Sequence, residues 1–357
     1  LVKNENTLSR TEEKLVEMSN GCICCTLRED LMIEVERLAK ENRFDYLLIE
    51  STGISEPIPV AQTFSFIDEN NEIDLSRFSY IDTMVTVVDA FNFFKDFGSP
   101  YTLKDKELSD MEGDDRTIVN LLTDQIEFAN VILINKCDLV PKNDLGLLKS
   151  IIHKLNPSAK IIETTHSKID INEIVNTKLF DFEDAEQSAG WIEELNKEQH
   201  IPETEEYGIS SFVFKHKYPF HPIRFWNYIQ HDFSSSIIRS KGLFWLASRP
   251  NQALSWSQAG GSLKADSAGV WWGSMPFEQR FKQPTFIENQ KKIEEDWDKD
   301  FQDRKNEIVI IGIDINEKKI TSELESCLLT EKELATLQWK EGYKDEWPVE
   351  RTYPLLD

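Results

Sequence analysis

The most informative part of this sequence runs Val131-Ile132-Leu133-Ile134-Asn135-Lys136-Cys137-Asp138. It begins with a continuous apolar run, which is typical of a strand buried on both faces of a parallel sheet. Similar runs lie at Phe44–Ile49, Met84–Val88 and Lys160–Glu163, and segments with helical periodicity separate them. Strands that alternate with helices in this way predict an α/β fold with a doubly wound, mostly parallel sheet.

The four polar residues after the central run match the Asn-Lys-x-Asp loop with which GTPases recognise guanine. In open α/β sheets, ligands bind at the carboxyl ends of the strands, and this loop lies at such an end. The carboxylate of Asp138 would accept hydrogen bonds from N1 and N2 of guanine, a donor pair that adenine lacks. We therefore assign Asn135, Lys136 and Asp138 to nucleotide binding. The alternative is a polar loop in which the aspartate only caps a turn.

A second predicted strand end carries an acid followed by a glycine, in Glu50-Ser51-Thr52-Gly53. In nucleotide hydrolases, such an acid holds Mg²⁺ through water and the glycine amide contacts the γ-phosphate. We assign Glu50 and Gly53 to the catalytic part of the site. A further loop, Glu163–Lys168, follows the fourth predicted strand, where GTPases place a loop against the base.

The phosphate-binding loop of such enzymes, Gly-x-x-x-x-Gly-Lys-Ser/Thr, does not occur in these 357 residues. The sequence begins with Leu rather than Met, and in such folds this loop follows the first strand. We therefore expect an N-terminally truncated domain whose phosphate-binding loop precedes Leu1. These residues alone would bind nucleotide poorly, which leaves GTP binding by this chain open.

Three of the five cysteines lie within four positions, in Asn20-Gly21-Cys22-Ile23-Cys24-Cys25-Thr26. Thiolates are soft ligands that suit Zn²⁺ or Cu(I), and three of them leave one position for a fourth donor. A predicted helix follows directly, and its N-terminus would favour the deprotonated thiols. We assign Cys22, Cys24 and Cys25 to metal binding. The alternatives are a redox pair or small residues buried at a turn.

The composition excludes several classes of protein. A formal charge of −24, from 40 Lys and Arg against 64 Asp and Glu, disfavours nucleic acid or an anionic membrane as a partner. No apolar run is long enough to span a membrane, and no signal peptide is evident. The odd number of cysteines argues against a secreted disulfide scaffold, so we expect a cytoplasmic protein.

We predict two domains. Residues 1–181 form the nucleotide-binding domain, residues 182–206 an acidic linker with one helix, and residues 207–357 a smaller α+β domain. All nine tryptophans follow residue 190, which marks the change in composition. We expect Trp245 and the Trp271-Trp272 pair to pack in the core or between the domains. We also expect His216, His221 and His231 to be structural or surface residues, because they lack the short spacing of metal ligands.

Several motifs together resemble the CobW family of metallochaperone GTPases, and its zinc-responsive bacterial branch most. They are Gly21–Cys25, the segment Glu50–Pro57 and the Asn-Lys-Cys-Asp loop, with Pro219–Arg224, Arg239–Ala247 and Trp256–Gly261 in the second domain. The resemblance implies a SIMIBI-type P-loop GTPase domain, Mg²⁺-dependent GTP hydrolysis and delivery of Zn²⁺ to an apo-metalloprotein client. Carried over, the three clustered cysteines are zinc ligands, Glu50 is the Mg²⁺ acid, and Asn135 and Asp138 contact guanine.

Two other functions stay open. One is a cobalt chaperone of the same family, acting in cobalamin synthesis or nitrile hydratase activation. The other is a zinc-binding regulatory module without GTPase activity. A Gly-x-x-x-x-Gly-Lys-Thr upstream of Leu1 would favour a chaperone over the regulatory module.

Overall fold

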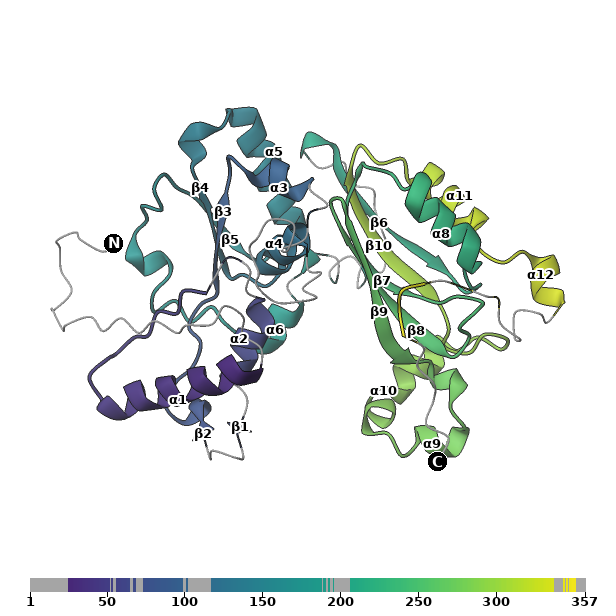
Figure 1. Cartoon of the computed structure of the whole chain (residues 1–357), viewed down its shortest axis with the longest axis horizontal. Coiled ribbons are helices and arrows are strands. Elements are labelled where there is room, and N and C mark those ends of the chain that lie inside the picture. Colours follow the sequence, from purple (N-terminus) through teal and green to yellow (C-terminus); the bar gives the residue numbers. More distant parts are fainter. Residues whose placement is uncertain are drawn as a thin grey trace.

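The computed structural model describes two domains side by side (Figure 1). The described residues are 25–51, 53, 56–64, 67–68, 73–98, 101, 117–187, 189–190, 192, 195, 206–336, 343, 345 and 347–350. The N-terminal domain contains a parallel sheet with helices around it, and the C-terminal domain contains an antiparallel sheet. The predicted α/β fold with a second, smaller domain is therefore confirmed, whereas the exact limits of the linker stay a prediction.

The sheet of the N-terminal domain comprises, in its described part, β3 (Val85–Asp89), β4 (Val131–Asn135) and β5 (Lys160–Glu163). The strands are parallel, β4 lies between the other two, and Asp89 pairs with Asn135 in the register. The first four residues of β4 are buried, as their continuous apolar pattern predicts. The helices of this domain are α1 (Cys25–Glu41), α2 (Pro57–Thr63), α3 (Phe93–Phe97), α4 (Ile118–Glu127), α5 (Lys142–Leu155) and α6 (Phe182–Gln187). A small antiparallel pair, β1 (Ile67–Asp68) and β2 (Ile73–Asp74), completes the described strands.

The predicted strand at Phe44–Ile49 is wrong. These residues have no regular secondary structure, and the side chain of Leu48 is 81% exposed. An apolar run becomes a strand only where a neighbouring strand supplies hydrogen-bonding partners. In the described residues the sheet ends at β3, whose Val87 is 55% exposed. The segment is held instead by the Tyr46 hydroxyl, which donates to Asp82 Oδ2 at 2.7 Å.

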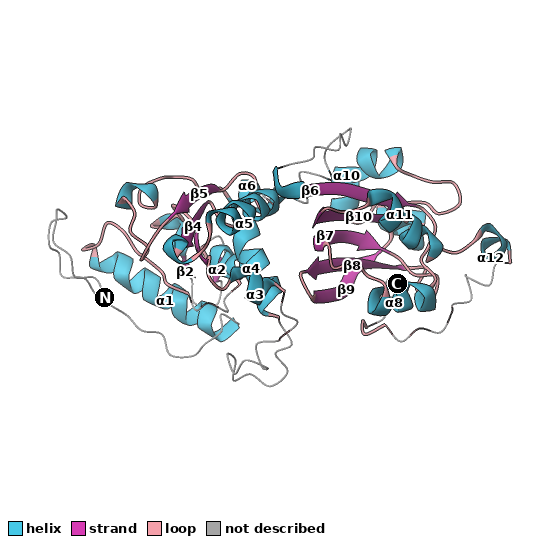
Figure 2. Ribbon diagram, turned by 90° about the horizontal axis from the view of Figure 1, so that it is seen from above, coloured by secondary structure: helices cyan, strands magenta, loops and turns pink. Residues whose placement is uncertain are grey.

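The C-terminal domain is built on an antiparallel sheet in which the described strands follow the order β6-β10-β7-β8-β9 (Figure 2). The strands are β6 (Ile209–His216), β7 (Ile237–Phe244), β8 (Gln252–Ala259), β9 (Ser262–Val270) and β10 (Asn306–Ile313). The helices are α8 (Pro222–His231), α9 (Phe277–Arg280), α10 (Pro284–Glu295), α11 (Glu317–Ser326) and α12 (Glu331–Ala335). No helix in the described ranges is both long and apolar enough to cross a membrane.

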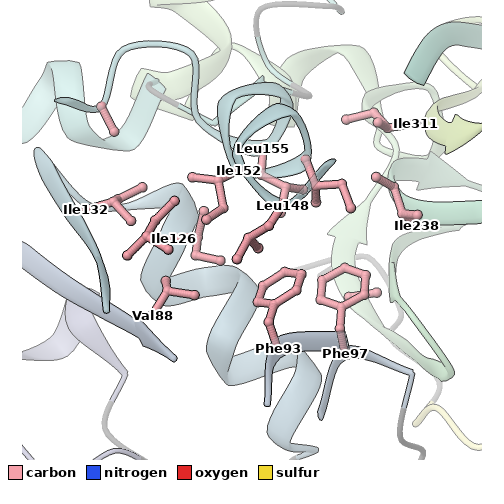
Figure 3. Packing of buried hydrophobic residues seen from close by; sticks show 14 of the residues in the cluster. Val88, Phe93, Phe97, Ile126, Ile132, Leu148, Ile152, Leu155, Ile238 and Ile311 are labelled. Atoms are coloured by element: carbon pink, nitrogen blue, oxygen red, sulfur yellow. The ribbon is translucent and has the colours of Figure 1, made fainter. Parts of the chain in front are cut away.

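Two apolar cores organise these elements. One lies in the C-terminal domain, where Phe220 and Phe225 stack at 3.9 Å between centroids and Trp256 packs against Phe225. The other joins the domains, because Phe93 and Leu148 of the N-terminal domain share one cluster with apolar residues of the C-terminal sheet, including Ile238 and Ile311 (Figure 3). Trp245 and Trp271 are buried beside Phe301, which confirms the packing predicted for these two tryptophans.

Candidate nucleotide and metal site

The Asn-Lys-x-Asp loop leaves the end of β4 beside the end of β3. Lys136 has a left-handed backbone, with φ of 62°, and its Nζ donates to Asp89 Oδ2 at 2.7 Å. Asn92 donates to the same carboxylate oxygen at 2.8 Å. Burial opposes ionisation of Asp89, but the hydrogen bonds from Lys136 and Asn92 outweigh it and lower the pKa of that carboxyl. The lysine is thus held by a carboxylate that stays charged.

Asn135 ties this loop to the next strand end. Its Oδ1 accepts hydrogen bonds from Thr164 Oγ1 at 3.2 Å and from the Ser167 amide at 3.0 Å. Ser167 follows β5 and has a left-handed backbone, with φ of 51°. The loop after β5, which we predict to lie against the base, is therefore bonded to the Asn-Lys-x-Asp loop. Asp138 is exposed on the same loop, so its carboxylate is open to solvent.

Glu50 and Gly53 are both exposed. Gly53 lies in a turn, and its carbonyl oxygen accepts a hydrogen bond from Gln125 Nε2 of α4 at 3.1 Å. Gln125 is held in turn, because its backbone carbonyl accepts from Thr86 Oγ1 of β3 at 2.7 Å. An exposed carboxylate at Glu50 is a hard oxygen donor of the kind that Mg²⁺ prefers.

The metal assignment falls mostly outside the described residues. Cys22 and Cys24 are not described, and Cys25 is described only as the first residue of α1. The helix that we predict after the cysteines is present, and it packs through Met32 and Val35. Within the described ranges, no group of three or more His, Cys, Asp and Glu side chains is placed to hold a metal ion.

His231 is exposed at the end of α8, and the other two histidines of this prediction have structural contacts. His216 Nδ1 accepts a hydrogen bond from the Tyr218 amide at 3.0 Å. His221 Nδ1 accepts from the Ile223 amide at 3.3 Å and so caps the start of α8. Burial lowers the pKa of both histidines. These contacts agree with the structural role that we predict for them.

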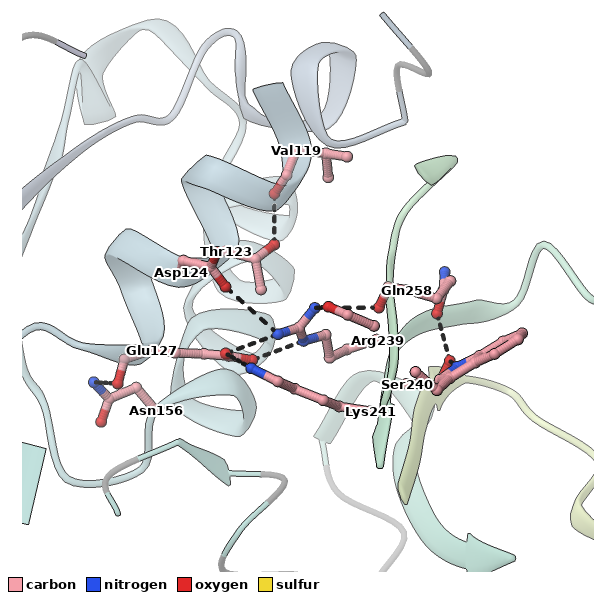
Figure 4. Close-up of polar contacts among 11 residues, drawn as sticks. Val119, Thr123, Asp124, Glu127, Asn156, Arg239, Ser240, Lys241 and Gln258 are labelled. Carbon is pink, nitrogen blue, oxygen red and sulfur yellow. Dashed lines mark hydrogen bonds and ion pairs between the residues drawn. The ribbon is translucent and has the colours of Figure 1, made fainter. Parts of the chain in front are cut away.

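The sequence pattern did not reveal a buried ion pair between the domains (Figure 4). Arg239 of β7 is 0% exposed and donates from Nε to Glu127 Oε1 at 2.8 Å and from Nη2 to Glu127 Oε2 at 2.9 Å. Asp124, one turn earlier on α4, lies 3.7 Å from Arg239 Nη2. Charged residues on an amphipathic helix usually form a solvated face, so spacing alone gave no signal for this pair.

The surroundings of Asp124 are unusual for a carboxyl. Desolvation by the surrounding protein and then the nearby Glu127 charge raise its pKa to about 6, although 40% of its side chain remains exposed. Arg239 and Lys241 act in the opposite direction. The last turn of α4 therefore presents the carboxylates of Asp124 and Glu127 to two cations of β7, Arg239 and Lys241.

The described fold is that of a nucleotide-binding α/β protein: parallel strands end in polar loops that hydrogen bonds join at one edge of the sheet. The chain belongs to the CobW family. Residues 2–163 match the CobW/HypB/UreG nucleotide-binding domain, and residues 209–328 match the cobalamin synthesis protein cobW C-terminal domain.

Curated relatives match along most of the chain. A Dictyostelium discoideum protein named zinc-regulated GTPase metalloprotein activator 1 is 43% identical over 343 residues, covering 94% of this chain and 71% of that protein. A Mycobacterium tuberculosis protein named as a zinc chaperone is 24% identical, with 98% of this chain and 85% of that protein covered. Among solved structures, zinc-bound YjiA GTPase from E. coli is 21% identical and covers 85% of this chain and 77% of its own, at a TM-score of 0.34.

Proposed function

We propose that this chain belongs to a GTP-dependent zinc metallochaperone, which binds zinc at Cys22, Cys24 and Cys25 and delivers it to an apo-metalloprotein. Family membership and the names of the relatives support a GTPase that handles zinc. The observation that best supports nucleotide binding is the geometry of the loop after β4. Hydrogen bonds to Asp89 and Ser167 hold Lys136 and Asn135 in place, and the Asp138 that follows them is exposed.

In this proposal each residue of the nucleotide site has a separate task. The Asp138 carboxylate accepts the paired N–H donors of guanine, and Asn135 keeps that loop against the loop after β5. Asp89 fixes the direction of the Lys136 ammonium. Glu50 would hold Mg²⁺, which when bound neutralises charge on the phosphates. Gln125 binds the carbonyl of Gly53 rather than its N–H, and we assign that N–H to the γ-phosphate.

Zinc is the cargo in this reaction. Three thiolates would hold it strongly, so release to a client would be slow without help. Hydrolysis of GTP would shift the neighbouring acid-x-x-Gly loop between two arrangements, as in other nucleotide switches. The cysteine loop is one helix away from that loop in the chain, and we propose that the two are coupled.

The base assignment is tested by Asp138→Asn in the natural protein. The amide replaces one acceptor with a donor, so GTP should bind more weakly and xanthosine triphosphate, which has a complementary acceptor, more tightly. Titration of both nucleotides measures the ratio of their affinities. An unchanged ratio would mean that the Asn-Lys-x-Asp match is accidental.

The metal assignment is tested by replacing Cys24 and Cys25 together with Ser. Zinc should then lose its tight site, whereas Cys327→Ser should keep it. Cys327 is a buried free thiol that donates to the Glu323 carbonyl, a contact that serine preserves. Competition with a chelator measures the affinity, and cobalt titrated in parallel decides between the two cargoes. Equal zinc affinity in the double variant and in the Cys327 control would refute the assignment.

A further inference from the structure

Helix α4 contacts the acid-x-x-Gly loop on one side and the C-terminal sheet on the other. On the first side, Gln125 Nε2 donates to the carbonyl of Gly53. On the second side, Glu127 pairs with Arg239 of β7. Gln125 and Glu127 are two positions apart, so these contacts leave the helix in different directions. One turn of helix therefore lies between the proposed γ-phosphate loop and the second domain.

The contact with the C-terminal domain extends along the whole helix. At its first turn, Thr117 Oγ1 donates to Ser262 Oγ at 2.9 Å and Asn120 Nδ2 donates to the same hydroxyl at 3.2 Å. In the same turn, Val119 lies beside Gly260, which connects β8 and β9. Together with the Arg239 pair at the last turn, these contacts fix α4 at both ends. The helix and the sheet therefore move as one body or separate along their full length.

The buried charge makes separation unfavourable. Among the described residues, both carboxylates that pair with Arg239, those of Glu127 and Asp124, come from α4. The remaining partners of the guanidinium are the neutral Ser257 hydroxyl and the Gln258 carbonyl. If α4 moved away from β7, a buried guanidinium would lose its counter-charge, which is among the largest penalties inside a protein. A displacement of α4 is therefore passed to β7 rather than absorbed at the interface.

We propose that α4 carries the state of the Gly53 loop to the C-terminal domain, with Gln125 as the residue that senses the loop and the Glu127–Arg239 pair as the connection to β7. The proposal rests on the GTPase function proposed above. When the γ-phosphate is lost, the Gly53 carbonyl moves, Gln125 loses or changes its hydrogen bond, and α4 takes β7 and the sheet with it. Coupling of this kind between two sites typically corresponds to roughly 5–150-fold in affinity.

Amide hydrogen exchange tests the proposal in the natural protein, because it needs no fluorophore or other attached probe. The amides of β7 and β8 are followed with GDP and with a non-hydrolysable GTP analogue. In the wild type, we expect the exchange rates of the β7 amides to differ between the two nucleotide states. In Gln125→Ala, both nucleotides should still bind, but this difference should be lost. Gln290→Ala is the matched control, because Gln290 of α10 also donates a side-chain hydrogen bond, to Glu294 at 2.9 Å, and lies outside α4. This control should keep the difference.

A second variant addresses the connection itself. Glu127→Gln keeps the shape of the side chain and removes its charge, so it should reduce the β7 difference while leaving the response of the Gly53 loop intact. The coupling through α4 would be refuted if β7 exchanged equally in the two nucleotide states of the wild type, or if Gln125→Ala kept the full difference. Either result would leave the proposed function standing. Absence of guanine-nucleotide binding by the natural protein would overturn the proposed function as well.

Discussion

Asn156 holds the end of α4 in place and gives a sharp test of the packing described above. It is fully buried at the C-terminal end of α5. Its Nδ2 donates to the carbonyls of Ile126 at 2.8 Å, Ala129 at 2.9 Å and, more weakly, Glu127 at 3.2 Å. The last carbonyls of a helix lack the donors that the following turn would provide, and the Asn156 side-chain amide donates hydrogen bonds to them instead. Its Oδ1 also accepts from the Ala159 amide at 3.0 Å.

Asn156→Ala removes these bonds and takes one donor from each of the three carbonyls, although the Ile126 carbonyl still accepts from the Ala129 amide at 3.3 Å. A hydrogen bond contributes about 0.5–1.5 kcal/mol net, and an unsatisfied buried group costs about 1–3 kcal/mol. The three donated and two accepted bonds, which include the one from Ser158 Oγ at 2.9 Å, place the loss at about 3–5 kcal/mol. Asn156→Asp should be worse near neutral pH, because it points a carboxylate at backbone carbonyls, and should recover in part when acid protonates it.

Urea denaturation followed by circular dichroism measures the loss, and hydrogen exchange of the α4 amides shows whether that helix opens first. Asn289→Ala is the control, because the exposed Asn289 makes a single bond to the Thr285 carbonyl at 3.0 Å. It should change the free energy of unfolding by no more than about 0.5 kcal/mol. A loss in Asn156→Ala below about 1 kcal/mol, or equal to that of the control, would refute this account of the end of α4.

Two further predictions concern the C-terminal domain. Hydrogen bonds from Arg224 lower the pKa of Glu333 to about 2, so the pair stabilises the fold above the ordinary carboxyl pKa and this stabilisation is lost as the pH falls towards 2. The melting temperature of Glu333→Gln should therefore fall below that of the wild type near pH 7. If the difference in melting temperature did not become smaller at low pH, the Arg224–Glu333 pair would not be its cause. A Cβ on Gly260, at φ of +48°, would lie 1.9 Å from the Phe97 carbonyl oxygen, whereas one on Gly269, at φ of +103°, meets nothing within 4 Å. Both alanine variants carry about 1–2 kcal/mol of backbone strain, but Gly260→Ala should have the lower urea midpoint, and equal midpoints would exclude the close contact.

The sequence was a good guide wherever a structure depends on local pattern. Val131–Ile134 is a buried central strand because four consecutive apolar residues need cover on both faces, and that requirement is visible in the residues themselves. Phe44–Ile49 is also mostly apolar, yet it forms no strand among the described residues because a strand also depends on its partner. Strands β8 and β9 give little signal in the sequence, because they contain several Ala, Ser and Gly residues of low β-propensity.

The same distinction applies to the site. The base loop could be assigned because Asn135 and Asp138 follow one strand, three positions apart. The contact of Lys136 with Asp89 depends on the register of two strands whose ends are about 46 positions apart in the chain, so no local pattern contains it. Glu127 and Arg239 are 112 positions apart and lie in different domains, so no local sequence pattern can predict that they pair.

The core shared by the two domains also bears on how this protein could be divided or recombined (Figure 3). A fragment that began near residue 206 would present Ile238, Val309 and Ile311 to water, and a contiguous apolar surface of that kind promotes aggregation. Neither half is therefore a sound unit for separate expression. Exchange of C-terminal domains between relatives would succeed only where the facing side chains of Phe97 and Leu148 were exchanged to match. Although the two family matches divide the chain between residues 163 and 209, the shared core makes the two parts one packing unit.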